Sequence, residues 1–185
     1  GSSSHGGRGS TRSGPPRGGP SRGGATKRDG LGGDQVEGRQ AVRELLLAGV
    51  RKVREVVMAE DLDPSPILDD IRQLAREQRV ALSEVGRKAL ERRSHTESSQ
   101  GVVALAVEMS PVELDQLARP AHGVVPFLLA LDSVTDPGNL GALLRTAECA
   151  GVSGVVLPRH RAAHLTPTVT KTAAGAIEHL PMALV

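Results

Sequence analysis

Hydrophobic positions in the first half of the chain alternate between the spacing of helices and that of strands. Two segments carry apolar residues every three to four positions, which predicts amphipathic helices. The first has Val42 and Leu46 on its apolar face, and the second begins at Ser65-Pro66. Strands are expected at residues 53–59, 80–85 and 101–107, and a short basic helix at residues 86–92. These elements predict a small α/β unit over residues 34–110, near the lowest length at which one core suffices.

Proline and glycine interrupt the next segment, so residues 111–123 are expected to form a linker with one short helix. The apolar run Phe127–Leu131 then predicts a strand that is covered on both faces. A helical stripe over residues 140–147 follows, and residues 155–157 read as another strand. Strand, helix and strand form a βαβ unit, which places ligands at the carboxyl ends of its parallel strands.

The first 33 residues differ in composition from the rest. They are mostly Gly, Ser, Arg and Pro, with Leu31 as their one leucine, and we expect them to be disordered. They hold six basic residues against one acidic residue, a charge of +5, whereas the remainder holds 17 basic against 20 acidic residues, a charge of −3. Binding to nucleic acid therefore cannot be argued from global charge. The tail is open to interpretation as a solvated linker, a weak tether to phosphate or a transit peptide.

Several residue types are scarce, which narrows the function classes. Cys149 is the single cysteine, so an internal disulfide is excluded and a reducing, cytoplasmic compartment is expected. No apolar run approaches the roughly 18 residues that a membrane span needs. With one Phe and no Trp or Tyr, an aromatic base-stacking surface is not expected. His160, His164 and His179 lack a short-spaced ligand pair, so we expect no metal site.

The segment 131–151 holds the best candidates for chemistry. A turn follows the expected strand, and Pro137-Gly138 bends the chain into a helix that Asn139 opens, where its side chain can cap free amides or bind a ligand. Arg145 follows six positions later, about 120° around the helix from Asn139. The structural alternative for Arg145 is a surface ion pair with Glu148.

The pattern from residue 132 to residue 151 is Asp-x-x-x-Asp-Pro-x-Asn-x-Gly-x-x-x-Arg-Thr-Ala-x-x-x-Gly. It resembles the first signature motif of the SpoU (TrmH-like) RNA 2′-O-methyltransferases. Further resemblance lies in residues 165–171 and 174–181. Residues 36–42 and 100–104 resemble the ends of the substrate-binding domain in the branch that methylates guanosine of large-subunit ribosomal RNA.

The resemblance implies an S-adenosylmethionine-dependent enzyme with a trefoil-knotted α/β methyltransferase domain over residues 124–185. It implies homodimers that methylate a ribose 2′-oxygen, with the N-terminal unit gripping ribosomal RNA. Asn139 would position the reacting groups. Arg145 would promote deprotonation of the 2′-hydroxyl, either as a base or as an electrostatic stabiliser, and both roles remain open.

Three departures from the family pattern stand out. Ala173 replaces a serine before Ala-Gly-Ala, and Ser99 replaces a histidine before Gln-Gly-Val. The chain also ends at Val185, before the motifs that build the knot and the cofactor pocket in the family. We therefore expect an N-terminal fragment with an incomplete methyltransferase domain, inactive and aggregation-prone alone, whose S-adenosylmethionine pocket lies beyond Val185.

Basic side chains are the expected contacts to RNA. The candidates are Arg87, Lys88, Arg92, Arg159, Arg161 and Lys171, each of which could equally be solvated. Two other function classes compete. A dinucleotide-binding fold would need a Gly-x-Gly-x-x-Gly turn, which is absent from the sequence. A non-catalytic RNA-binding or dimerisation module is the remaining alternative.

Overall fold

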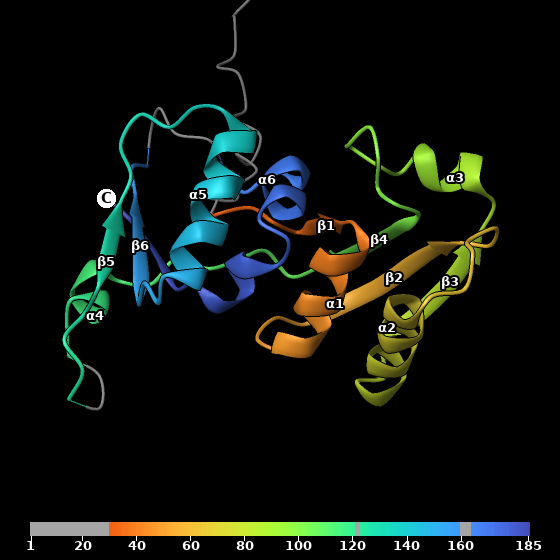
Figure 1. Cartoon of the computed structure of the whole chain (residues 1–185), viewed down its shortest axis with the longest axis horizontal. Coiled ribbons are helices and arrows are strands. Elements are labelled where there is room, and N and C mark those ends of the chain that lie inside the picture. The colour runs from red at the N-terminus through yellow and green to blue at the C-terminus, as the bar shows by residue number, and fades with distance from the viewer. Residues whose placement is uncertain (1–29, 121–122, 160–163) are drawn as a thin grey trace, which may run out of the picture.

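The computed structural model describes residues 30–120, 123–159 and 164–185, which form two α/β units (Figure 1). The N-terminal unit has a four-stranded sheet in the order β1-β4-β2-β3, and the C-terminal unit has a three-stranded sheet in the order β5-β6-β7. Helix α1 and strand β1 are the parts of the N-terminal unit that lie nearest to the C-terminal unit (Figure 1). The α/β class predicted from the sequence is confirmed.

The sheet of the N-terminal unit is mixed. Its strands are β1 (Gln35–Glu37), β2 (Val53–Ala59), β3 (Ala81–Val85) and β4 (Val102–Ala106). Strand β2 pairs in parallel with β3 and antiparallel with β4, which also pairs antiparallel with β1. Its helices are α1 (Arg39–Ala48), α2 (Pro66–Glu77) and the short α3 (Arg87–Glu91).

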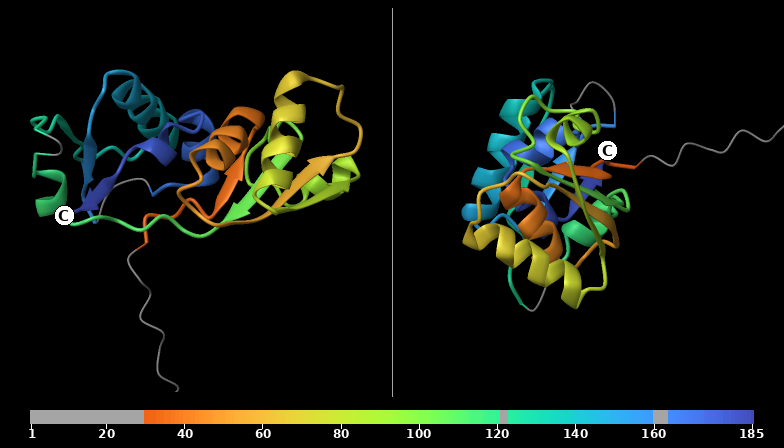
Figure 2. Two further views of the ribbon diagram at one scale, coloured as in Figure 1. Left: turned by 90° about the horizontal axis from the view of Figure 1, so that it is seen from below. Right: turned by 90° about the vertical axis from the view of Figure 1, so that its right-hand side faces the viewer.

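Strand β2 is buried on both faces because its side chains alternate between two apolar clusters. Val56 and Met58 face the core under α1 and α2, whereas Val57 and Ala59 pack with Leu90 of α3. Helices α1 and α2 lie side by side on one side of the sheet (Figure 2, left). The predicted strands and helices of this unit are confirmed, with bounds that differ by one or two residues.

The C-terminal unit is built on a parallel sheet. Its elements are β5 (Leu128–Ala130), α5 (Pro137–Cys149), β6 (Gly154–Leu157), α6 (Pro167–Thr172), the 3-10 helix η1 (Ala176–His179) and β7 (Met182–Leu184). The linker holds the predicted short helix, α4 (Leu114–Leu117), which contacts β7. Helix α5 packs so closely on α6 that a Cβ atom on Gly141 would lie 2.9 Å from the carbonyl oxygen of Val169.

Two sequence-based expectations are wrong. Strand β5 is not covered on both faces: it is an edge strand, with Leu128 and Leu129 half-buried and Phe127 56% exposed. Residues 30–33 are ordered rather than part of a free tail, because Leu31 is buried against the C-terminal core. The expectation of disorder for residues 1–29 lies outside the described residues.

Candidate active site at the turn between β5 and α5

The start of α5 is fixed by Asp136 rather than by Asn139. The Asp136 Oδ1 atom accepts a hydrogen bond of 2.6 Å from the backbone N–H of Asn139, and Pro137 occupies the first turn. We expected the Asn139 side chain to be available for capping, but Asp136 takes that role. The exposed Asn139 amide is therefore left for a ligand.

A hollow of about 510 Å³ lies beside this turn, where the chain leaves β5. It is lined by residues 133–136 and by Asn139, Ala142, Leu143 and Thr146. The last four residues recur at helical spacing and share one side of α5. Hydroxyl, carboxylate and amide groups thus line a depression at the carboxyl end of a parallel strand, the usual ligand position in such sheets.

Arg145 is exposed on another side of α5 and does not line the hollow. Within the described part of the chain, its side chain makes no hydrogen bond or ion pair, and Glu148 instead accepts a weak contact from the thiol of Cys149 at 3.7 Å. The surface ion pair that we considered for Arg145 is therefore not formed. The catalytic roles of Asn139 and Arg145 stay predictions.

The candidate RNA-binding residues are dispersed. Arg87 donates to Asp61 Oδ2 at 2.7 Å, and this hydrogen bond raises the pKa of Arg87 and lowers that of Asp61. Lys88 and Arg92 are exposed on and just after α3, far along the chain from the hollow. An ion pair with Asp61 offsets part of the Arg87 charge that a phosphate would meet.

The remaining candidates belong to the C-terminal unit. Lys171 is half-buried, with its Cγ atom 3.6 Å from the position that a Cβ of Gly38 would take, so it packs toward the N-terminal unit. Arg159 is exposed beside the end of β7, where its backbone N–H bonds to Val185 at 2.8 Å. Arg161 lies outside the described residues. The RNA-binding role of all six residues stays a prediction.

Sequence reasoning did not predict the environment of Glu37, whose carboxylate is fully buried. It accepts hydrogen bonds from the backbone N–H of His95 at 2.6 Å, from the hydroxyls of Ser94 and Thr96, and from Gln35 at 2.8 Å. Burial opposes ionisation, but these hydrogen bonds outweigh it and lower the pKa of Glu37. Glu37 therefore fixes the loop that follows the basic helix α3.

Two further findings concern binding partners. None of the helices among the described residues is long and apolar enough to span a membrane. No group of three His, Cys, Asp or Glu side chains in that part of the chain is arranged to hold a metal ion. His179 instead lies 3.4 Å from Glu44 Oε2, across the boundary between the two units.

Two family models match the chain, one for each unit. Residues 35–112 match the RNA 2′-O ribose methyltransferase substrate-binding domain, and residues 126–185 match the SpoU rRNA methylase family. The chain belongs to the SpoU family. The family predicted from the motif at residues 132–151 is thereby confirmed.

Curated relatives of this SpoU chain are named as RNA methyltransferases. YacO of Bacillus subtilis (strain 168), a TrmH-family protein, is 41% identical over 154 residues, which are 82% of this chain and 61% of YacO. The 23S rRNA (guanosine-2′-O-)-methyltransferase RlmB of Haemophilus ducreyi is 36% identical over 155 residues, 80% of this chain and 61% of RlmB. The SpoU chain thus spans about three fifths of the length of these relatives.

Solved structures of SpoU-type enzymes share the fold. An AdoMet-bound rRNA methyltransferase from Sinorhizobium meliloti aligns with a TM-score of 0.62 and 26% identity, over 81% of this chain and 53% of that one. The SpoU methyltransferase AviRb from Streptomyces viridochromogenes, in complex with AdoMet, aligns with a TM-score of 0.64 and 24% identity, over 82% and 54% of the two chains. The second likeness concerns the fold alone.

Proposed function

We propose that the full-length protein transfers a methyl group from S-adenosylmethionine to the ribose 2′-oxygen of a guanosine in large-subunit ribosomal RNA. The observation that carries the proposal is the hollow beside the β5–α5 turn, which the motif residue Asn139 lines with a side chain that the helix cap does not use. The RlmB relatives carry this activity in their names, and they support the choice of substrate.

Asn139 and Arg145 act from different directions in this proposal. Asn139 hydrogen-bonds the substrate in the hollow. Arg145 lies on an exposed side of α5, outside the hollow. It has no protein partner among the described residues, so its long side chain is free to approach a phosphate or the developing alkoxide. The proposal favours the electrostatic role over the role of a base, because an exposed guanidinium without a protein partner among the described residues is placed to approach developing negative charge.

The residues that line the hollow do not enclose it. One turn and one side of α5 line the hollow, so they supply a single wall. We assign the remaining walls to the part of the relatives' length that this chain does not span, and we derive no step through the donor. The proposal also includes a homodimer, which the family resemblance supports. It includes a cytoplasmic location, which the single, exposed cysteine Cys149 supports.

A methyl-transfer assay tests the proposal. The full-length protein is incubated with methyl-labelled S-adenosylmethionine and unmodified ribosomal RNA, and the modified position is mapped on the RNA. We expect label on one ribose, and strongly reduced labelling with Arg145→Ala. The alternative, a non-catalytic RNA-binding or dimerisation module, predicts RNA binding without any transfer while Asn139 and Arg145 are intact.

A further inference from the structure

A buried ion pair joins the two units. The Arg51 guanidinium donates to Glu178 through two nitrogens, at 2.9 Å and 2.5 Å, and the two side chains are 6% and 1% exposed. A third nitrogen, Nη1, donates to the carbonyl oxygens of Gly33 at 2.6 Å and Val107 at 3.0 Å. Arg51 follows α1 of the N-terminal unit, and Glu178 belongs to η1 of the C-terminal unit.

The carbonyl partners of Arg51 belong to two segments at the boundary between the units. Gly33 ends the segment in which Leu31 bonds to both Met109 and Leu165, and Val107 begins the path from β4 to the linker. One guanidinium therefore binds both boundary segments and the opposite unit. Because Arg presents its donors in a rigid planar fork, these contacts fix direction as well as distance.

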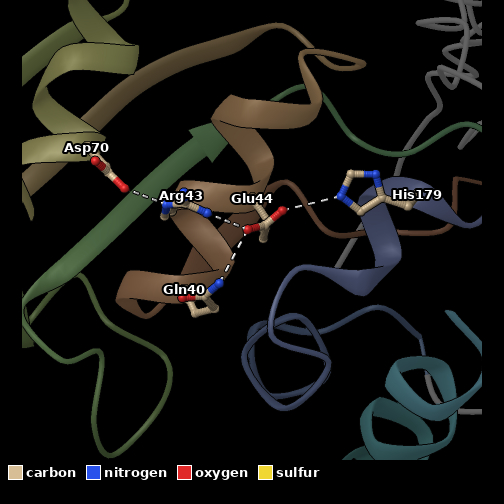
Figure 3. Close-up of polar contacts among 5 residues, drawn as sticks. All are labelled: Gln40, Arg43, Glu44, Asp70 and His179. Carbon is tan, nitrogen blue, oxygen red and sulfur yellow. Dashed lines mark hydrogen bonds and ion pairs between the residues drawn. The ribbon is translucent and has the colours of Figure 1, made fainter. Parts of the chain in front are cut away.

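A second contact lies on α1 next to the first. Glu44 approaches His179 at 3.4 Å and is held from its own helix by Arg43 at 2.9 Å and Gln40 at 3.3 Å (Figure 3). Gly175 permits this approach: its φ is +93°, and a Cβ atom there would lie 2.3 Å from the Cβ of Glu44. With Glu44 of α1 and Arg51 just beyond α1 both engaged, η1 is held at two points, which resists rotation of one unit about the other.

We propose that Arg51 and Glu178 are positioning residues that set the angle between the RNA-binding unit and the methyltransferase unit, and so determine which ribose reaches the Asn139 hollow. The proposal rests on the proposed function. An RNA held by the N-terminal unit delivers its reacting ribose through that angle, so freedom at the junction lowers the fraction of bound RNA in reactive alignment. A short RNA that contacts only the methyltransferase unit does not depend on the angle.

The first test measures the junction itself by hydrogen exchange on the full-length protein. In Arg51→Met and in the milder Glu178→Gln, we expect faster exchange of the Leu165 and Met109 amides, which bond across the junction, and unchanged exchange of the β2 amides. Arg72→Met is the matched control, since it removes an exposed ion pair that lies within the N-terminal unit. Unchanged exchange at Leu165 and Met109 in both variants would overturn the proposal.

The second test compares methyl transfer to a long ribosomal RNA fragment and to an oligonucleotide that carries the target nucleotide and its immediate neighbours. For Glu178→Gln and Arg51→Met, we expect kcat/KM on the long RNA to fall about 10- to 100-fold. On the short RNA, kcat/KM should stay within about twofold of the parent value, because that RNA contacts only the methyltransferase unit and does not depend on the angle between the units. Equal losses on both RNAs would show a merely structural role. A parent protein that methylates neither RNA would refute the proposed function, while hydrogen exchange would still decide whether the pair fixes the junction.

Discussion

Asn139 and Arg145 belong to the same helix, yet Asn139 lines the hollow beside the β5–α5 turn and Arg145 projects from another side of α5. Six helical positions turn a side chain by about 600°, which is about 240° beyond one full turn and leaves the two residues about 120° apart. They therefore cannot act as one hydrogen-bonded pair in this arrangement. A substrate that bridges the hollow and the flank of α5 would contact the Asn139 amide in the hollow and the Arg145 guanidinium outside it.

This separation predicts that loss of Arg145 affects turnover and not folding. Arg145→Ala removes an exposed side chain without a protein partner among the described residues, so the free energy of unfolding should change by less than about 0.5 kcal/mol. Methyl transfer by the full-length protein should fall by about 10²-fold or more. Single-turnover kinetics and thermal unfolding check the two parts. Glu148→Ala, on the same helix, is the control and should retain activity.

The Arg51–Glu178 pair predicts a large loss of stability for single substitutions. Arg51→Met leaves the Glu178 carboxylate buried without its charge partner, which should cost about 3–5 kcal/mol. The exposed pair of Arg72 with Glu84 should contribute less than about 1 kcal/mol, so Arg72→Met should unfold at a urea concentration close to that of the parent protein. Urea unfolding of the three proteins measures the difference. Equal midpoints for Arg51→Met and the parent would show that the pair contributes little.

Two glycines with positive φ allow the cost of backbone strain to be measured apart from the cost of a steric clash with a neighbouring residue. Gly175 has φ of +93° and meets Glu44, whereas Gly151 has φ of +75° and has nothing within 4 Å of a built Cβ. Gly151→Ala should cost about 1 kcal/mol from strain alone. Gly175→Ala should cost clearly more, because η1 must also move away from α1. Similar losses for the two variants would indicate that α1 yields to the added methyl group.

The buried, hydrogen-bonded carboxylate of Glu37 should make the stability of the N-terminal unit fall at low pH. The pKa of Glu37 is lowered on folding from its ordinary value of 4.5, so its contribution to stability is complete above that pH and is lost as the pH falls through the lower, folded value. Glu37→Gln should remove this pH dependence and cost about 1–3 kcal/mol at pH 7, since one oxygen becomes an NH₂ that faces hydrogen-bond donors. Unfolding curves recorded between pH 3 and pH 7 measure both effects.

Local pattern was enough to predict most helices and strands. The stripe of Leu140 and Leu144 located α5, and Ser65-Pro66 located the start of α2, because amphipathic spacing and first-turn proline act over a few residues. The residues of the β5–α5 turn were found in the same way. The side chain that caps α5 could not be predicted from local pattern, because Asp136 and Asn139 are both good capping residues and the choice depends on the path of the turn.

Contacts between distant segments were not predictable. Arg51 and Glu178 are 127 residues apart, and neither lies in a pattern that marks a buried ion pair. Glu37 stands in a short strand where a charged residue is ordinarily exposed, and its burial depends on donors from the loop at residues 94–96. Leu31 lies in a stretch whose composition predicts disorder, and its burial depends on packing in the same apolar cluster as Met109 and Leu165, which are distant in sequence.

The segment around Leu31 also limits which parts of such an enzyme can be exchanged for those of a relative. It lies before the substrate-binding match that begins at residue 35, yet it bonds to Met109 at the end of that match and to Leu165 of the methyltransferase unit. A recombination event, or a designed chimera, that exchanged either matched domain alone would part Leu31 from one of the surfaces it fits. Functional chimeras should therefore be those that carry residues 30–33 together with both surfaces that Leu31 contacts.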